Sequence, residues 1–328
     1  MINKSKTKEN KKMAVISFYS YKGGSGRTTT TLNTLYYLIQ EKQPKSNSPL
    51  IIVDADNESY GMSMLIRDTE KYCSPEVSLQ GLGVRSNQST FISNGNPRDW
   101  RTYTELNKYF IPVGNYFTKD IENEAVLLLR SDVTPAEQRS SWETVFAMNS
   151  SGEKESKNLS AALRVMKMCG CTVVFDTPSG TQDMATFSLD NSDYIVCCMR
   201  PSVQFEKGTR LCFSKFIEKW TKTGDEKNVV FCPSAVPFRE MVIDSKVYPK
   251  HYVDTLFASF REQMEAKAHD SRGAVNIIWD MKDGAVPGIP EVDRFKWQEC
   301  CLGKFPAEKE DEKLAKEKYK KLASILNY

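Results

Sequence analysis

Short apolar runs recur along the chain, and most of them lack an alternation of apolar and polar residues. Strands of a parallel sheet are buried on both faces and have this continuous pattern, whereas half-exposed strands alternate. The pattern therefore predicts seven strands, at residues 14–19, 50–53, 109–113, 172–175, 194–199, 229–232 and 276–279.

The segments between these runs have a different period. Apolar residues recur three and four positions apart, which places them on one face of an α-helix. This spacing is found within residues 32–39, 159–166, 213–220 and 253–260. Because strands alternate with helices, the order indicates βαβ units. We therefore predict an α/β fold, with a mostly parallel, twisted sheet of about seven strands and helices on both faces.

Two polar stretches interrupt this order, at residues 68–108 and 131–157. We interpret both as insertions in one domain that spans residues 13–303. The remaining residues, 304–328, contain an amphipathic helix with Ala315, Tyr319, Leu322 and Leu326 on one face. We expect this helix to dock on the domain, and a membrane-surface or partner helix is the alternative.

The composition of the 328-residue chain is that of an ordinary globular protein, with 40% hydrophobic and 27% charged residues. No apolar run approaches the roughly 20 residues of a membrane-spanning helix. Nine cysteines fall largely inside apolar runs, which indicates buried thiols in a reducing compartment. We therefore expect a cytoplasmic protein, and leave open peripheral attachment to a membrane or to the nucleoid.

The net charge of +3 comes from one end of the chain. Residues 1–12, the basic tail, hold five lysines and one glutamate and carry +4, so the other residues sum to −1. We expect the tail to be disordered and solvated, with contact to DNA or anionic lipid as the alternative. The overall charge therefore gives no support for a DNA-binding or membrane-binding function.

A glycine-rich segment follows the first predicted strand and precedes a helix. Its sequence is Tyr21-Lys22-Gly23-Gly24-Ser25-Gly26-Arg27-Thr28-Thr29. Glycines let backbone N–H groups converge on an anion, and the N-terminus of the helix adds its positive end. A cation at the end of such a loop meets phosphates, and the next hydroxyl, that of Thr28, is a ligand for Mg²⁺. The segment therefore predicts a phosphate-binding loop.

This segment resembles the deviant phosphate loop K-G-G-x-G-K-[ST] of the ParA/MinD family of ATPases. Five residues match the pattern, namely Lys22, Gly23, Gly24, Gly26 and Thr28. Arg27 stands where most members have lysine, and some relatives share this arginine. The resemblance implies a three-layer P-loop NTPase of the SIMIBI class that binds ATP and Mg²⁺ through residues 22–29.

Acidic residues close two of the predicted strands. Asp54 and Asp56 follow one apolar run at positions i and i+2, and Asp176 ends another. Carboxylates crowded at the ends of strands repel one another, and a bound cation relieves that repulsion. By the resemblance, Asp56 lies in switch I and positions the attacking water. It also implies that Asp54 and Asp176 join Thr28 around Mg²⁺.

The resemblance also implies where the base lies. Residues 233–237 and 288–293 occupy the places that contact adenine in the family, which makes Pro233 and Pro290 nucleotide-binding residues. The asparagine that usually follows the sixth strand is missing here. The choice between ATP and GTP is therefore less firmly indicated than phosphate binding.

Lys22 carries the remaining implication. In the family this lysine reaches across a face-to-face dimer to the partner's phosphates. The resemblance thus implies catalytic roles for Lys22, Arg27 and Asp56 in a slow ATPase. Such a protein forms an ATP-sandwich homodimer and is stimulated by a protein partner. Two alternatives stay open: a nucleotide-binding scaffold with little hydrolysis, and a DNA-partitioning ATPase.

Overall fold

The structure is a computed structural model. It describes residues 13–56, 59, 61–66, 77–84, 91–131, 145–148, 154–236, 241–243, 246–248, 252–271, 273–278, 288–296 and 298–327. The basic tail, parts of both expected insertions and the end of the last expected strand lie outside these residues.

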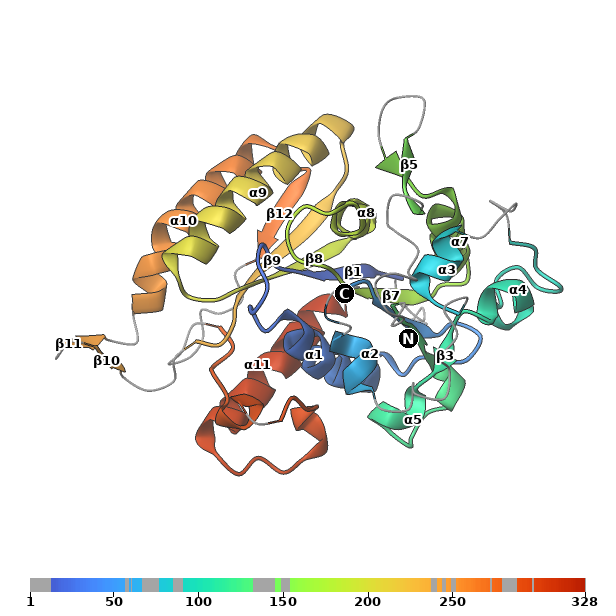
Figure 1. Ribbon diagram of the computed structural model, residues 1–328, viewed down its shortest axis with the longest axis horizontal. Coiled ribbons are helices and arrows are strands. Elements are labelled where there is room, and N and C mark those ends of the chain that lie inside the picture. The colour runs from blue at the N-terminus through green and yellow to red at the C-terminus, as the bar shows by residue number, and fades with distance from the viewer. Residues whose placement is uncertain are drawn as a thin grey trace, which may run out of the picture.

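An eight-stranded sheet runs through the centre of the molecule in the order β12-β9-β8-β1-β7-β2-β4-β3 (Figure 1). All pairs are parallel except β3 with β4. The strands are β1 Val15–Tyr19, β2 Leu50–Asp54, β3 Ile111–Pro112, β4 Val126–Leu129, β7 Thr172–Asp176, β8 Tyr194–Met199, β9 Lys227–Pro233 and β12 Val275–Ile278.

This sheet confirms the predicted fold class, with eight strands in place of about seven. Every predicted run contributes a strand, and the additional one is β4, which pairs with β2 on one side and β3 on the other. The edge strand β3 runs antiparallel, with Ile111 opposite Leu128. Two short hairpins lie apart from the sheet, β5 Ala147–Met148 with β6 Lys154–Glu155 and β10 Met241–Ile243 with β11 Lys246–Tyr248.

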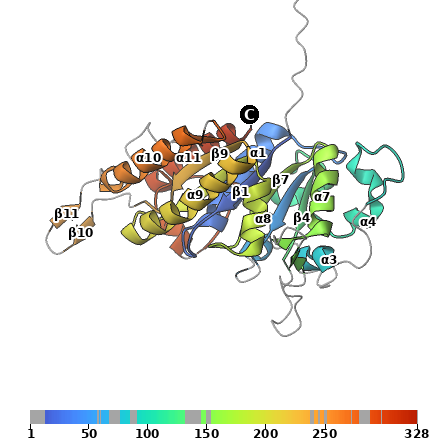
Figure 2. The same ribbon diagram turned by 90° about the horizontal axis from the view of Figure 1, so that it is seen from above.

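Helices cover both faces of the sheet, as Figures 1 and 2 show. One face carries α1 Arg27–Lys42, α2 Gly61–Leu65, α5 Gly114–Phe117 and α11 Glu310–Leu326. The other carries α3 Leu79–Val84, α7 Lys157–Met168, α8 Asp183–Asn191, α9 Val203–Thr223 and α10 Tyr252–Asp270. The short α4 Thr104–Asn107 lies beyond the β3 edge.

The strands supply apolar side chains to both layers. Ile16 and Phe18 of β1 pack in the cluster that includes α1 and α11. Val15 and Tyr19, which alternate with them, pack in the clusters of the opposite face. Burial on both sides removes the polar alternation of a half-exposed strand, which explains the continuous apolar runs in the sequence.

Helix α11 docks along α1. Its stripe Ala315, Tyr319, Leu322 and Leu326 is almost fully buried in the same cluster as Leu35 of α1. The helix thus completes one layer of the fold. No helix among the described residues is long and apolar enough to cross a membrane.

The described part of the first polar stretch is ordered around aromatic side chains. Trp100 is buried, its ring meets Phe110 edge-on at 5.1 Å, and its backbone N–H donates to Asn47 O at 3.0 Å. Tyr103 is buried beside them. These residues pack into the core shared by β2, β4 and α7.

Candidate functional site

The glycine-rich segment forms a loop between β1 and α1. Gly24 and Gly26 have φ values of 75° and 76°, in the left-handed region that strains other residues. Gly26 is the N-cap of α1 and has no side chain to cap the helix, whereas Ser156 and Ser202 cap α7 and α9. The first N–H groups of α1 are therefore left to an anion, as in phosphate-binding loops.

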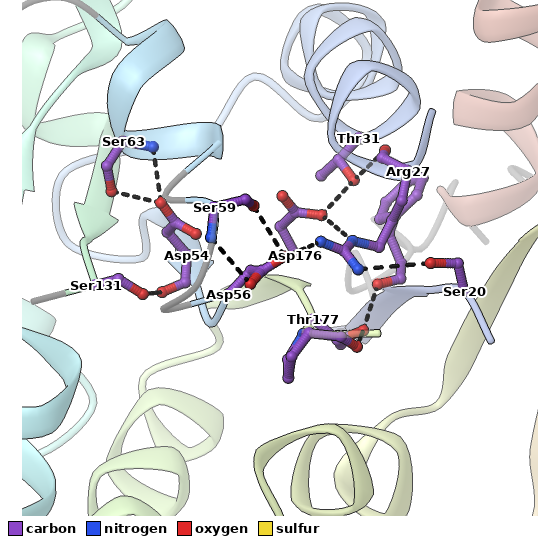
Figure 3. A network of polar contacts seen from close by, with 12 residues as sticks. Ser20, Arg27, Thr31, Asp54, Asp56, Ser59, Ser63, Ser131, Asp176 and Thr177 are labelled. Atoms are coloured by element: carbon purple, nitrogen blue, oxygen red, sulfur yellow. Dashed lines mark hydrogen bonds and ion pairs between the residues drawn. The ribbon is translucent and has the colours of Figure 1, made fainter. Parts of the chain in front are cut away.

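Arg27, the first residue of α1, turns its guanidinium toward the carboxyl ends of the neighbouring strands (Figure 3). Its Nη2 lies 2.5 Å from Asp56 Oδ2, and its Nε lies 3.0 Å from Asp176 Oδ1. Its Nη1 is 3.5 Å from Ser20 Oγ. The Arg27 side chain is only 7% exposed. Burial by itself would lower the pKa of Arg27, but Asp176 and Asp56 hold it above its ordinary value.

Asp54 and Asp176 are direct neighbours across the sheet, because β2 and β7 pair in register at these two residues. Asp54 Oδ2 accepts hydrogen bonds from the N–H and the hydroxyl of Ser63, at 2.8 and 2.5 Å. Burial, followed by the charge of Asp176, raises the pKa of Asp54 to about 7. Burial also raises the pKa of Asp176, and Arg27 offsets part of that rise. The site therefore concentrates negative charge in a buried place.

These carboxylates have spare capacity for a cation. Within the part of the chain that the structure describes, Asp54 Oδ1 and Asp176 Oδ2 are buried without a hydrogen-bond partner. A hydrogen bond from Thr28 also lowers the pKa of Asp176, so the threonine hydroxyl lies beside it. Mg²⁺ prefers such oxygen ligands and is usually held by one or two carboxylates together with phosphates. The residues present thus fit a Mg²⁺ site.

Asp56 has a different environment. Its Oδ2 accepts from Arg27 and, at 2.9 Å, from the hydroxyl of Ser59. It lies two residues beyond Asp54, in the loop that leads toward α2. A carboxylate in this place, beside the loop and next to a metal-type cluster, is suited to orient a water.

The segment after β7 is tied to β1 and the loop. Both the N–H and the hydroxyl of Thr177 donate to Phe18 O, at 3.1 and 2.8 Å. Further along, the N–H of Gly180 donates to Ser20 O at 3.1 Å. The Asp-Thr-Pro-Ser-Gly segment is therefore held against the end of β1, where the glycine-rich loop begins.

A second backbone segment borders the loop at its other side. The hydroxyl of Ser234 donates to Ser25 O at 2.5 Å, and Ile289 N–H donates to Pro233 O at 2.8 Å. Val236 pairs with Pro290 in an isolated parallel bridge. Ala235 lies between Ser234 and Val236 and has a φ of 51°. This value is uncommon for a residue other than glycine and is found at strained functional turns.

The first two residues of the loop, Tyr21 and Lys22, contact α9. Lys22 is exposed, and its Nζ donates to Gln204 Oε1 at 3.2 Å. The ring of Tyr21 lies over Gly208, where an added Cβ would stand 2.0 Å from the ring. The absence of a side chain at Gly208 therefore leaves room for the ring of Tyr21.

The structure brings most of the expected site residues together. Arg27, Thr28, Asp54, Asp56 and Asp176 form one cluster, and Gly23, Gly24, Ser25, Gly26 and Thr29 belong to the adjoining loop and first helical turn. Pro233 accepts a hydrogen bond from Ile289, the residue before Pro290, and the next residue, Ser234, bonds to Ser25, so the two proline segments adjoin each other beside the loop. Lys22 is the exception, since its ammonium bonds to Gln204 of α9 and to none of these carboxylates in the hydrogen bonds of the described residues.

The sequence did not indicate several residues that hold the site in place. Ser20, Ser63 and Ser234 each bond to the loop or to one of its carboxylates. Ser131 also donates to Asp54 O at 2.7 Å. Serine is common and these positions follow no motif, so only the fold reveals them.

Proteins of known structure share the fold of this chain. No family model and no curated protein matches the chain. Among solved structures, apo McdA of Cyanothece superposes with a TM-score of 0.60 at 16% identity, over 95% of this chain and 99% of McdA. A putative plasmid partition protein of Borrelia burgdorferi bound to AMPPNP gives 0.56 at 15% identity, over 96% of this chain and 99% of that one.

The cell division ATPase MinD of Pyrococcus furiosus gives a TM-score of 0.54 at 15% identity, covering 95% of this chain and 99% of MinD. These three superpositions run over nearly the whole of both chains. They confirm the ParA/MinD-type P-loop fold that the loop motif implied.

Proposed function

We propose that this chain is a Mg²⁺-dependent ATPase that acts as a nucleotide-controlled switch. The observation that carries the proposal is the cluster of Arg27 with Asp54, Asp56 and Asp176 at the end of a glycine-rich loop. Structural neighbours support the choice of ligand, since the Borrelia protein was solved with AMPPNP and a McdA variant with ATP.

The loop supplies the phosphate site. The uncapped N–H groups that begin α1 bind phosphate oxygens, and Gly24 and Gly26 give the backbone the conformation that points these groups inward. Ser25, Thr28 and Thr29 lie in the same loop and first turn. In this proposal Arg27 adds its positive charge to the cradle when nucleotide is bound.

The carboxylates supply the metal site. Thr28, Asp54 and Asp176 would hold Mg²⁺, because Asp54 Oδ1 and Asp176 Oδ2 lack partners among the described residues. The cation would supply positive charge against the phosphates of the nucleotide. Asp56, two residues beyond Asp54, orients the attacking water and accepts its proton.

The remaining assignments extend this site outward. The Pro233 and Pro290 segments border the base, and ATP is the nucleotide proposed. Lys22 is exposed beside α9, a position from which it reaches the phosphates of a second copy in an ATP-sandwich homodimer. A protein partner stimulates hydrolysis. MinD of Aquifex aeolicus, another structural neighbour, was solved in complex with MinC.

Two measurements test the proposal. Wild type is expected to release phosphate from Mg²⁺-ATP slowly, and Asp56→Ala is expected to bind ATP without releasing phosphate. Binding with equal inactivity of both proteins would instead make the chain a nucleotide-binding scaffold. No binding of Mg²⁺-ATP by the wild type would overturn the proposal.

Light scattering after size exclusion tests the dimer. The mass is expected to double in Mg²⁺-ATP for Asp56→Ala and to stay monomeric for Lys22→Ala. Because ligand binding to the dimer drives association by mass action, the shift depends on nucleotide concentration. An unchanged mass for Asp56→Ala, with ATP shown to be bound, would rule out the sandwich.

A further inference from the structure

Each nitrogen of the Arg27 guanidinium has a hydrogen-bond partner inside the protein. Nε bonds to Asp176, Nη2 bonds to Asp56, and Nη1 faces Ser20. Thr31 adds a hydroxyl that lies 3.3 Å from the same Asp176 oxygen. The side chain is thus bonded on every nitrogen and nearly inaccessible to solvent.

Arginine is suited to this place by its shape. Its planar fork carries donors in fixed directions and bonds to two carboxylates at once, whereas a lysine offers one compact ammonium. Asp56 comes from the end of β2 and Asp176 from the end of β7, so one side chain ties two strand ends to α1.

These bonds affect how a nucleotide binds. A nucleotide phosphate can pair with Arg27 only if Arg27 separates from the two buried carboxylates. Buried charge pairs of this kind are costly to break, because each carboxylate is left without its counter-ion.

We propose that Asp56 and Asp176 act as an internal competitor for the nucleotide by holding Arg27 in the ligand-free chain. The nucleotide affinity of this chain is then set by an exchange of partners at Arg27, from carboxylates to phosphates. This inference rests on the proposed function, since it names the residue that regulates binding at that same site.

The test compares two variants that each replace a carboxyl with an amide, at pH 8, where Asp54 is mostly ionised and both variants remove a negative charge. Asp56→Asn weakens the bond to Arg27, while Asp54→Asn removes a neighbouring carboxylate that bonds to Ser63. ADP is the probe, and titration calorimetry in EDTA keeps metal ligation out of the comparison. Asp56→Asn is expected to bind ADP about tenfold more tightly than wild type. The gain in ADP affinity from Asp54→Asn is expected to be less than half of that gain.

A double-mutant cycle separates competition from simple repulsion between carboxylate and phosphate. In an Arg27→Gln background, the gain from Asp56→Asn is expected to fall to the gain seen with Asp54→Asn. If Arg27→Gln does not fold, the comparison of the two single variants decides alone. Equal gains from Asp56→Asn and Asp54→Asn, or no gain from Asp56→Asn, would overturn the inference.

The proposed function fails in a different way. If the wild type binds neither ADP nor ATP when Mg²⁺ is present, both proposals are overturned. If it binds them and the two asparagine variants behave alike, only the competition at Arg27 is overturned.

Discussion

Helix α1 takes part in two regions that are stabilised by different means. Its first residue, Arg27, is held among carboxylates at the ends of β2 and β7. Its flank packs against α11 through apolar side chains such as Leu35 and Leu322. The first region gathers charges that burial alone would disfavour, and the second removes apolar surface from water.

The difference shows which part of the helix is able to change with a ligand. The groups of a buried charge cluster can exchange partners, because a phosphate can take the place of a carboxylate beside an arginine, and a cation can take the place of an arginine beside a carboxylate. An apolar interface has no such substitute partner, so opening it always costs free energy. We therefore expect nucleotide to rearrange the start of α1 while α11 stays docked.

The largest expected effect tests the charged region. Arg27→Met is expected to lower the free energy of unfolding by about 3–5 kcal/mol at pH 8, because Asp56 and Asp176 are left buried without a counter-ion. Urea denaturation in EDTA measures it. Arg101→Met breaks the pair with Asp99, whose arginine is 62% exposed, and is the control expected to change little. Equal effects of the two variants would contradict the contrast.

The next effect tests the apolar region. Leu322→Ala is expected to cost about 3 kcal/mol, since it leaves a cavity between α11 and α1. Because no charge is involved, the loss is expected to be the same at pH 6 and pH 8 and at low and high salt. Lys320→Ala on the exposed side of α11 is the matched control. A loss that varied with pH would show that the two regions are not independent.

The smallest of the three effects is the change in stability between pH 6 and pH 8. The pKa of Asp54 is about 7 in the folded chain against an ordinary value of 3.8, so the folded state holds a proton that the unfolded state has lost. Stability therefore falls as pH rises from about 4 to about 7, and then levels off. Between pH 6 and pH 8 the loss from this group is about 1 kcal/mol.

Asp54→Asn isolates this contribution, because asparagine does not titrate. Thermal unfolding in EDTA is expected to show a weaker pH dependence for Asp54→Asn than for wild type. The remaining dependence has the same sign, because burial also raises the pKa of Asp176. Identical pH profiles for the two proteins would contradict the raised pKa of Asp54.

Most strands of the sheet could be predicted from the sequence, because strands that are buried on both faces have continuous apolar runs. The sequence was insufficient for β4, Val126–Leu129, whose four apolar residues stand between the predicted strand at residues 109–113 and the polar stretch at residues 131–157. No long helix separates β3 from β4, so the alternation of strands and helices did not reveal it. The antiparallel direction of β3 follows from that short connection and was missed for the same reason.

The site divides in a similar way. The loop and its carboxylates were predicted because each is a short contiguous motif or a strand end. The partners of Arg27 were not, since they depend on how β1, β2 and β7 come together in space. Likewise Ser63 and Gln204 reach the site only through the packing of α2 and α9.

The central place of β1 has a consequence for the making of this protein. β1 leaves the ribosome well before its neighbours in the sheet, which are β7 and β8, Thr172–Asp176 and Tyr194–Met199. Pairings between segments so distant in sequence form late and slowly. The strands that flank the glycine-rich loop are therefore not complete until residue 199 has been translated. A truncated chain that ends earlier would contain the motif but would not form the site.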